Sequence, residues 1–261
     1  MWEDVTMNWK KGLAIAFSAL VIVGAVAGCG NSSSNDANKP IIFAGETTYP
    51  PFEYADGDKY KGFEVDLAEA LGKEMGRKVE YKSMGFDALI PALQSNQIDA
   101  IASGMVITPE REKQISFTKP YYDVAIAIIV KDSVNNIKNE KDLAGKVVGV
   151  QIGTTGADVA HEQKGATVKE FDQVTTCLQD LENGNVQAVV IDEPVADYYI
   201  HQGHMQGLKV IPLGIQKQQV AIGVNKKNTE LLEQLNAALE KLKANGTYAK
   251  LEQKWFGKVQ Q

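Results

Sequence analysis

The fold prediction starts from Lys146-Val147-Val148-Gly149-Val150, because this run begins the second of two similar series of predicted strands and helices. A helical pattern follows Gly156, a β-branched run occupies residues 168–171, and a second helical pattern ends at Leu181. An apolar run over residues 186–191 closes the series. Short β-branched runs that alternate with apolar residues at helical spacing are typical of βαβ units.

A similar series of runs comes earlier in the chain. The predicted elements are strands at 41–44, 79–81, 99–102 and 125–130, helices at 63–75 and 86–93, and C-terminal helices at 228–243 and 247–255. Two βαβ series predict an α/β protein of two lobes, with mostly parallel sheets and flanking helices.

The amino-acid composition excludes several classes of protein and of binding partner. The 261 residues are 44% hydrophobic and 23% charged, which excludes a disordered tail and a multi-span membrane protein. The net charge of −6 argues against a nucleic-acid partner, because phosphate binding needs clustered cations. Two cysteines and three histidines provide no ligand spacing for a metal and no nucleophile–histidine arrangement, and His201 and His204 are interpreted as surface residues. We therefore expect no metal, no cofactor and no catalysis.

An export signal is predicted at the N-terminus. Lys10 and Lys11 precede an apolar run over residues 12–28, which a membrane anchor would also explain. Val26-Ala27-Gly28-Cys29, however, looks like a bacterial lipobox. Residues 1–28 would then be a lipoprotein signal peptide and Cys29 the acylated N-terminus. Residues 29–39 would form a flexible tether that holds an extracytoplasmic protein on the cell membrane, at the outer face of the cytoplasmic membrane or in the periplasm. Cys177 would have no partner and is interpreted as a packing residue.

Several stretches, in order, resemble one protein family. They are Gly45-Glu46-Thr47-Thr48-Tyr49-Pro50-Pro51-Phe52-Glu53-Tyr54, Gly62-Phe63-Glu64-Val65-Asp66-Leu67, Phe86-Asp87-Ala88-Leu89-Ile90-Pro91-Ala92-Leu93, Ile107-Thr108-Pro109-Glu110-Arg111, residues 117–122, Val148-Gly149-Val150, Asp192-Glu193, Asn245-Gly246-Thr247-Tyr248 and Lys254-Trp255-Phe256. Over residues 40–257 the chain resembles the polar amino-acid-binding proteins of bacterial ABC importers (extracellular solute-binding proteins, family 3), and most of all the binders of arginine, other basic amino acids or glutamine.

The resemblance implies a type II periplasmic-binding-protein-like fold that closes on one free amino acid. It places residues 40–122 and 222–257 in lobe 1 and residues 124–218 in lobe 2. Two hinge crossings are expected, near 122–125 and 219–221. It also implies an ABC permease as partner, a monomer and no enzymatic activity.

The family pattern assigns the ligand's charged groups to particular residues. Arg111 would hold the α-carboxylate with its planar fork, helped by backbone N–H groups of Val106 and Thr155. From the residues alone, Arg111 could equally be an exposed side chain in the charged stretch 110–113. The turn that contains Thr154 leads into a helix and could present N–H groups to an anion such as a carboxylate.

The ammonium is assigned to Asp192 and to the carbonyl of Gly104. Asp192 could instead cap the helix that begins near Pro194. Relatives often carry a hydroxyl or a carboxylate where this chain has Val106, so one ammonium contact is expected to be missing, with Ser103 or a water in its place.

Specificity is expected to come from Glu46, Tyr49, Phe86 and Gln151. The two aromatic rings would enclose a flat or cationic group and Glu46 would meet its far end, although both rings could be ordinary core residues. Gln151 stands where glutamine binders of the family carry a lysine that would repel a cation. Arginine is therefore the favoured ligand and glutamine the alternative. Two other functions remain open at the level of the sequence: an extracytoplasmic dehydratase that uses Glu46 or Glu193, and a binder for signalling or adhesion.

Overall fold

The computed structural model describes residues 39–202, 205–214 and 217–257, and these residues belong to one compact unit. The predicted signal peptide, Cys29 and most of the tether lie outside the described residues, as does His204. None of the helices formed by the described residues has both the length and the apolar composition that a membrane crossing requires.

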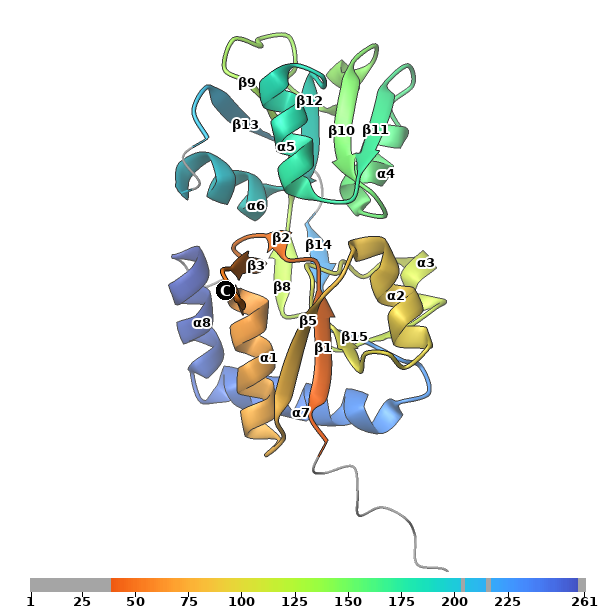
Figure 1. Cartoon of the computed structure of the whole chain (residues 1–261), viewed down its shortest axis with the longest axis vertical. Helices are drawn as coiled ribbons and strands as arrows, with labels where there is room; N and C mark the ends of the chain where they lie inside the picture. The colour runs from red at the N-terminus through yellow and green to blue at the C-terminus, as the bar shows by residue number, and fades with distance from the viewer. Residues whose placement is uncertain (1–38, 203–204, 215–216, 258–261) are drawn as a thin grey trace, which may run out of the picture. The chain divides into compact units, whose positions relative to one another are not determined.

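The first lobe is built on a five-stranded sheet in the order β5-β1-β6-β15-β7 (Figure 1). Its strands are β1 (Ile41–Gly45), β5 (Val79–Ser83), β6 (Ala100–Ile101), β7 (Ser116–Phe117) and β15 (Gly223–Val224). Its helices are α1 (Phe63–Glu74), α2 (Phe86–Gln94), α3 (Pro109–Glu112), α7 (Thr229–Ala244) and α8 (Thr247–Phe256). A small sheet of β2 (Thr48–Tyr49), β3 (Glu53–Asp56) and β4 (Lys59–Lys61) adjoins it.

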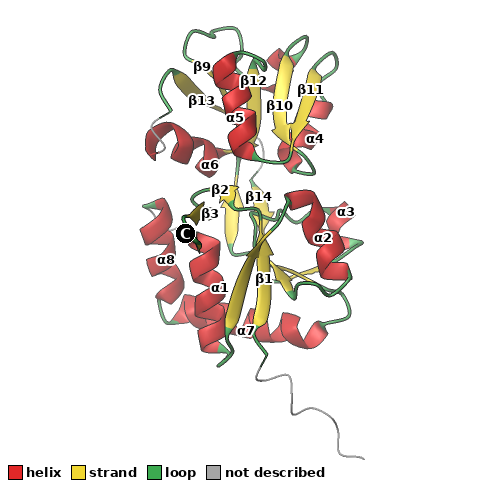
Figure 2. Ribbon diagram, viewed as in Figure 1, coloured by secondary structure: helices red, strands yellow, loops and turns green. Residues whose placement is uncertain are grey.

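The second lobe has a sheet in the order β11-β10-β12-β9-β13, with helices on its faces (Figure 2). Its strands are β9 (Ile126–Lys131), β10 (Val147–Gln151), β11 (Thr167–Phe171), β12 (Ala188–Asp192) and β13 (Leu208–Pro212). Its helical segments are η1 (Glu140–Leu143), α4 (Thr155–His161), α5 (Val174–Asn183), α6 (Glu193–Asp197) and η2 (Tyr198–Gln202). The two-lobed α/β prediction is confirmed.

Two antiparallel strands join the lobes. β8 (Tyr122–Val124) pairs with β14 (Gln218–Val220), and both lie between the two large sheets (Figure 1). These are the segments where the hinge crossings were expected. The lobe boundaries themselves stay a prediction.

The sheets are mixed, which corrects the expectation of mostly parallel sheets. In the first lobe β1 is parallel to β5 and β6, but β15 is antiparallel to β6 and β7. In the second lobe β10 is parallel to β11 and β12, whereas β9 is antiparallel to β12 and β13. The antiparallel strands β9 and β15 are those that follow the crossings, so the chain enters each sheet from the opposite end.

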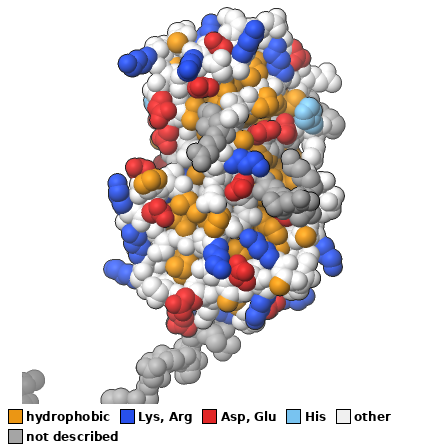
Figure 3. Space-filling view, turned by 180° about the vertical axis from the view of Figure 1, so that it is seen from behind, with side chains coloured by type: hydrophobic (Ala, Val, Ile, Leu, Met, Phe, Trp, Pro, Cys, Tyr) orange, Lys and Arg blue, Asp and Glu red, His pale blue; other side chains and the backbone are white. Residues whose placement is uncertain are grey.

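Charged side chains are interspersed on the surface. On the face turned 180° from that of Figure 1, Lys and Arg side chains lie among Asp and Glu side chains over the whole height of the molecule (Figure 3). That face carries no continuous patch of one sign.

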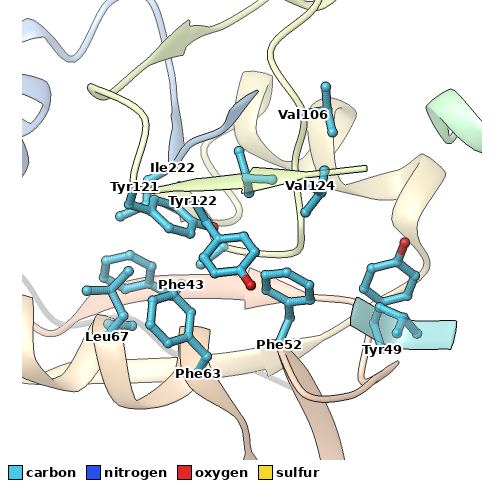
Figure 4. Close-up of a cluster of buried hydrophobic side chains, with 14 of the residues drawn as sticks. Phe43, Tyr49, Phe52, Phe63, Leu67, Val106, Tyr121, Tyr122, Val124 and Ile222 are labelled. Atoms are coloured by element: carbon cyan, nitrogen blue, oxygen red, sulfur yellow. The ribbon is translucent and has the colours of Figure 1, made fainter. Parts of the chain in front are cut away.

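The core of the first lobe is aromatic. Phe63 and Leu67 of α1, spaced one turn apart, are fully buried, with Leu67 beside Phe43 and Phe63 beside Tyr122 (Figure 4). The rings of Tyr122 and Phe52 meet edge to face, with centroids 5.4 Å apart. Figure 4 also shows Tyr49 beside Phe52, with its hydroxyl pointing away from this cluster. The cluster therefore packs against the Tyr49 ring, while the hydroxyl lies outside the cluster.

Candidate ligand-binding site

One cavity is lined by all eleven residues that the sequence assigned to ligand binding. They are Glu46, Tyr49, Phe86, Ser103, Gly104, Val106, Arg111, Gln151, Thr154, Thr155 and Asp192. Six further residues line it: Gly156, Val174, Cys177, Val189, Val190 and Ile191. The structure therefore brings the predicted residues together; their roles toward a ligand are proposals.

The cavity lies where strands end and helices begin. On the first lobe, Glu46 follows β1, Phe86 begins α2, and Ser103 comes shortly after β6. On the second lobe, Gln151 ends β10 and Asp192 ends β12. The carboxyl ends of strands in α/β sheets are the usual place for binding groups. The cavity uses such ends from both sheets.

Arg111 is a buried cavity residue, which excludes the exposed-surface alternative. Its Nη1 donates to the carbonyl of Val106 at 2.6 Å and its Nη2 to the carbonyl of Gly153 at 2.9 Å. The guanidinium lies 5.3 Å from the centroid of the Phe86 ring. Burial lowers the pKa of Arg111, and the charges of Asp158 and Asp192 oppose that change. Arg111 is thus held in place as a cation before any ligand is bound.

Asp192 faces the cavity and does not cap the following helix. It occupies the N-cap position of α6 but makes no capping hydrogen bond with its side chain. Its Oδ2 instead accepts a 2.8 Å hydrogen bond from the hydroxyl of Tyr49. Burial raises the pKa of Asp192 to about 6, although the hydrogen bond from Tyr49 and the charge of Arg111 act in the opposite direction. The capping alternative is therefore wrong.

Glu46 is the second buried carboxylate of the cavity. Its Oε2 accepts hydrogen bonds from the hydroxyl of Thr48 at 2.8 Å and from Nε2 of Gln151 at 3.2 Å. Gln151 also donates to the carbonyl of Asp172 at 3.1 Å, so its amide is fixed between two acceptors. Burial raises the pKa of Glu46, and these hydrogen bonds lower it in part. Gln151 thus orients Glu46 without adding a charge.

The two threonines form the start of α4. The Thr154 hydroxyl caps this helix by accepting the N–H of Ala157 at 3.2 Å, and it donates to the carbonyl of Gln151 at 2.8 Å. The Thr155 hydroxyl donates to Oε1 of Gln218 at 2.7 Å. Both hydrogen bonds of the Thr154 hydroxyl therefore stabilise the turn before α4.

Gly104 and Ser103 make a tight part of the wall. Gly104 has a φ of 54°, and a Cβ there would lie 3.1 Å from Cε1 of Tyr49, so only glycine fits. The Ser103 hydroxyl donates to Oε1 of Glu53 at 2.7 Å and accepts the N–H of Glu46 at 2.9 Å. Its proton points to Glu53 and one lone pair of its oxygen takes the N–H of Glu46, so a second lone pair is left to accept from an ammonium. Replacement by Ser103 of the contact expected to be missing at Val106 stays a prediction.

Two buried acids behind the wall were missed by the sequence reasoning. Glu53 and Glu64 are both fully buried, and Glu64 accepts the N–H of Gly104 with both oxygens, at 2.9 Å each. Both lie inside quoted family stretches, Pro-Phe-Glu-Tyr and Gly-Phe-Glu-Val. A glutamate directly after a buried aromatic residue was the signal that could have revealed them.

Several side chains among the described residues donate hydrogen bonds from one lobe to the other. Besides those from Tyr49 to Asp192, from Gln151 to Glu46 and from Arg111 to Gly153, the hydroxyl of Tyr199 donates to the carbonyl of Thr48 at 2.8 Å. The cavity walls are thus joined through the same side chains that were predicted to hold a ligand.

Glu193 and Cys177 are the other candidate reactive groups of the described residues. Glu193 lines a separate groove with Tyr122 and Trp255 and does not line the cavity. Cys177 is a free, buried thiol, and burial raises its pKa to about 12, as suits a packing residue. Over the part of the chain that the structure describes, no three His, Cys, Asp or Glu side chains group to hold a metal ion.

Residues 41–258 match the family described as bacterial extracellular solute-binding proteins, family 3. The chain belongs to this family. The protein is similar to the "Arginine-binding extracellular protein ArtP" of Bacillus subtilis, with 35% identity over 95% of this chain and 98% of that one.

Solved structures of family relatives resemble this solute-binding protein closely. An ancestral arginine-binding protein bound to arginine has 43% identity and a TM-score of 0.82 over 84% of this chain and 99% of that one. An ancestral arginine-binding protein bound to glutamine has 44% identity and a TM-score of 0.79 over 84% of this chain and 98% of that one. A third, an ancestral amino-acid-binding protein described as a precursor of cyclohexadienyl dehydratase, has 37% identity and a TM-score of 0.76 over 83% of this chain and 95% of that one.

Proposed function

We propose that this solute-binding protein captures one free amino acid in the cavity, with arginine favoured, and presents it to an ABC permease. The lobes would close by rotation about β8 and β14, since a ligand that contacts both lobes favours the closed state. The names of similar proteins support the amino acid, and two of those names also include an ABC transporter.

The charged side chains that line the cavity favour arginine as the ligand. One cation, Arg111, and two carboxylates, Asp192 and Glu46, line it. Arg111 would pair with the α-carboxylate of the ligand and Asp192 with its ammonium, which leaves Glu46 for a cationic side chain. Buried charges require partners, and arginine supplies one for all three groups. Glutamine would leave Glu46 with only the hydrogen bonds from Thr48 and Gln151.

Calorimetry with residues 30–261 tests this assignment. We expect Glu46→Gln to reduce arginine affinity far more than glutamine affinity, and Glu69→Gln, an exposed change on α1, to alter neither. Equal losses for the two amino acids would remove the argument for a cationic ligand. An absence of binding heat with arginine, lysine, histidine and glutamine would overturn amino-acid capture itself.

Glutamine binding is the nearest alternative, supported by the relative that holds glutamine. A dehydratase is the alternative of another class, supported by the resemblance to a dehydratase precursor and by the raised pKa of Glu46. Because Glu193 lines a different groove, Glu46 would have to act as the acid or base. Turnover of prephenate or arogenate by the purified protein would establish the enzyme.

The proposal also covers where in the cell the protein is located. Acylation of Cys29 would anchor a monomer to the cell membrane through a polar tether, as the lipobox-like stretch 26–29 suggests. We expect Cys29→Ser to move the protein from the membrane fraction to the soluble extracytoplasmic fraction. Retention of the variant in the membrane would refute the lipid anchor.

A further inference from the structure

Two buried glutamates connect the separate pieces of backbone that make the first-lobe wall of the cavity. Glu53 begins β3 and Glu64 lies in the first turn of α1, and neither side chain has any solvent exposure. They contact the wall through Ser103 and Gly104. The ligand assignments above leave both glutamates without a role.

The hydrogen bonds from neighbouring residues are all donated toward the two glutamates. The N–H of Glu46 donates to Oγ of Ser103, and the Ser103 hydroxyl donates to Oε1 of Glu53. Glu64 receives only donors: the N–H of Gly104 reaches both of its oxygens, and the hydroxyl of Tyr121 donates to Oε1. Glu64 therefore has the surroundings of an ionised carboxylate.

Glu53 has the surroundings of a neutral acid. Its Oε2 is buried and receives no hydrogen-bond donor, although the Glu53 and Glu64 side chains are hydrogen-bonded to each other. Two carboxylates can share such a contact only if one of them carries a proton. The proton belongs on Glu53 Oε2, the oxygen that lacks a donor.

The charges around the pair favour the same protonation. The titratable groups that act on the pair are themselves acidic: Glu46, Tyr49, Tyr81, Tyr121 and Asp192, with Tyr248 behind Tyr121. Within the described residues neither glutamate forms an ion pair with a lysine or arginine. Burial first, and then the charge of Glu64, raise the pKa of Glu53 well above its usual range. Like-charged carboxyls in one dry site behave in this way.

We propose that Glu53 and Glu64 share one proton, with Glu53 as the neutral donor, and that this pair positions the Ser103–Gly104 backbone in the cavity wall. Both glutamates are positioning residues, because neither lines the cavity. The Gly104 carbonyl is the part of this wall assigned to the ligand's ammonium, so the effect of the pair on affinity rests on the proposed function. The sharing of a proton between Glu53 and Glu64 is independent of that function.

Infrared difference spectroscopy of the ligand-free full chain in detergent at pH 8 tests the shared proton. We expect a carbonyl stretch of a protonated carboxyl group that shifts in D₂O and is absent from Glu53→Gln. Glu69→Gln, an exposed control, should keep it. Absence of the band from the unmodified protein, or its persistence in Glu53→Gln, would overturn the proposal whether or not any amino acid binds.

Calorimetry with arginine and with glutamine tests the positioning. Glutamine at position 53 can accept from Ser103 and donate to Glu64, so Glu53→Gln should keep the affinity within about threefold. Glu53→Ala leaves both neighbours unpaired and should lose about tenfold or more. Glu64→Gln turns amide donors toward the donors Gly104 and Tyr121 and should lose at least as much. Equal losses in Glu53→Gln and Glu53→Ala would refute the neutral-donor role, and a wild-type protein that binds none of arginine, lysine, histidine and glutamine would refute the proposed function alone.

Discussion

The Tyr49 hydroxyl lies 2.8 Å from Oδ2 of Asp192 and donates a hydrogen bond to it across the cavity. Tyr49 belongs to β2 of the first lobe and Asp192 ends β12 of the second. In the proposed function, the ligand's ammonium would meet Asp192 beside this hydroxyl. If the proposed function holds, the protonation of Asp192 affects both this contact between the lobes and the binding of the ligand.

Ligand affinity should fall as the pH falls through about 6. Burial raises the pKa of ligand-free Asp192 to about 6, whereas a bound ammonium favours the ionised form and lowers that pKa. Binding below this pH must release a proton, and the dissociation constant should rise toward about tenfold per pH unit. Calorimetry between pH 8 and 5, in buffers of different ionisation enthalpy, measures both effects. A dissociation constant that stays constant over this range would refute the role of Asp192.

The stability of the ligand-free protein should change in the opposite direction. The folded pKa of Asp192 lies above the ordinary value of 3.8, so its stabilising contribution is complete below about pH 4 and is lost as the pH rises through about 6. A difference of about two pKa units corresponds to roughly 3 kcal/mol. Thermal unfolding of the unmodified protein and of Asp192→Asn should therefore show a gap that changes between pH 4 and 7. A constant gap would contradict the raised pKa.

Tyr49→Phe should move the pH dependence to higher pH. The Tyr49 hydroxyl stabilises the ionised form of Asp192, so its loss raises the pKa of Asp192 further above about 6. At pH 6.5 the variant should bind arginine more weakly than the unmodified protein, and the difference should shrink by pH 8. Tyr60→Phe, which changes an exposed ring, is the control. A loss of the same size at both pH values would indicate a packing effect instead.

Arg111→Lys should be nearly as damaging as Arg111→Ala. The guanidinium spans the carbonyls of Val106 and Gly153 and stacks on Phe86, a geometry that a single ammonium cannot reproduce. Loss of a buried charge partner costs about 2–5 kcal/mol of binding free energy. Calorimetry with arginine measures this loss, and Lys113→Ala removes a nearby exposed cation as control. Near-normal binding by the lysine variant would contradict a bidentate carboxylate clamp.

Helices and strands with a regular spacing of apolar residues were predictable, because this spacing is a property of the local sequence. The helix expected over 63–75 occurs at Phe63–Glu74, and the strand expected over 146–150 occurs at Val147–Gln151. The short strands β2 and β7 and the single turn of α3 were not predicted, since two to four residues give too little periodicity. The antiparallel pairing of β9 and β15 depends on how the chain crosses between lobes, which no local pattern contains.

The residues that line the cavity were likewise better predicted than the contacts that their side chains make. Arg111 and Asp192 could be named from the family resemblance, yet their alternatives as a surface residue and a helix cap were decided only by burial and by the bond from Tyr49. Glu53 and Glu64 were missed because their partners lie about 40 to 57 residues away in sequence. Such contacts arise from packing and leave no spacing in the sequence.

Gln151→Lys should switch the preference from arginine toward glutamine. Gln151 donates to Glu46 at 3.2 Å, so a lysine there would place an ammonium beside the carboxylate proposed to receive the cationic side chain. The new cation would pair with Glu46 and repel arginine, while a neutral glutamine side chain would meet no repulsion. Arginine affinity should fall at least about tenfold, glutamine affinity should change much less, and Gln253→Lys, an exposed change on α8, should affect neither. Parallel losses for both amino acids would show that Gln151 supports the cavity without selecting the ligand by charge.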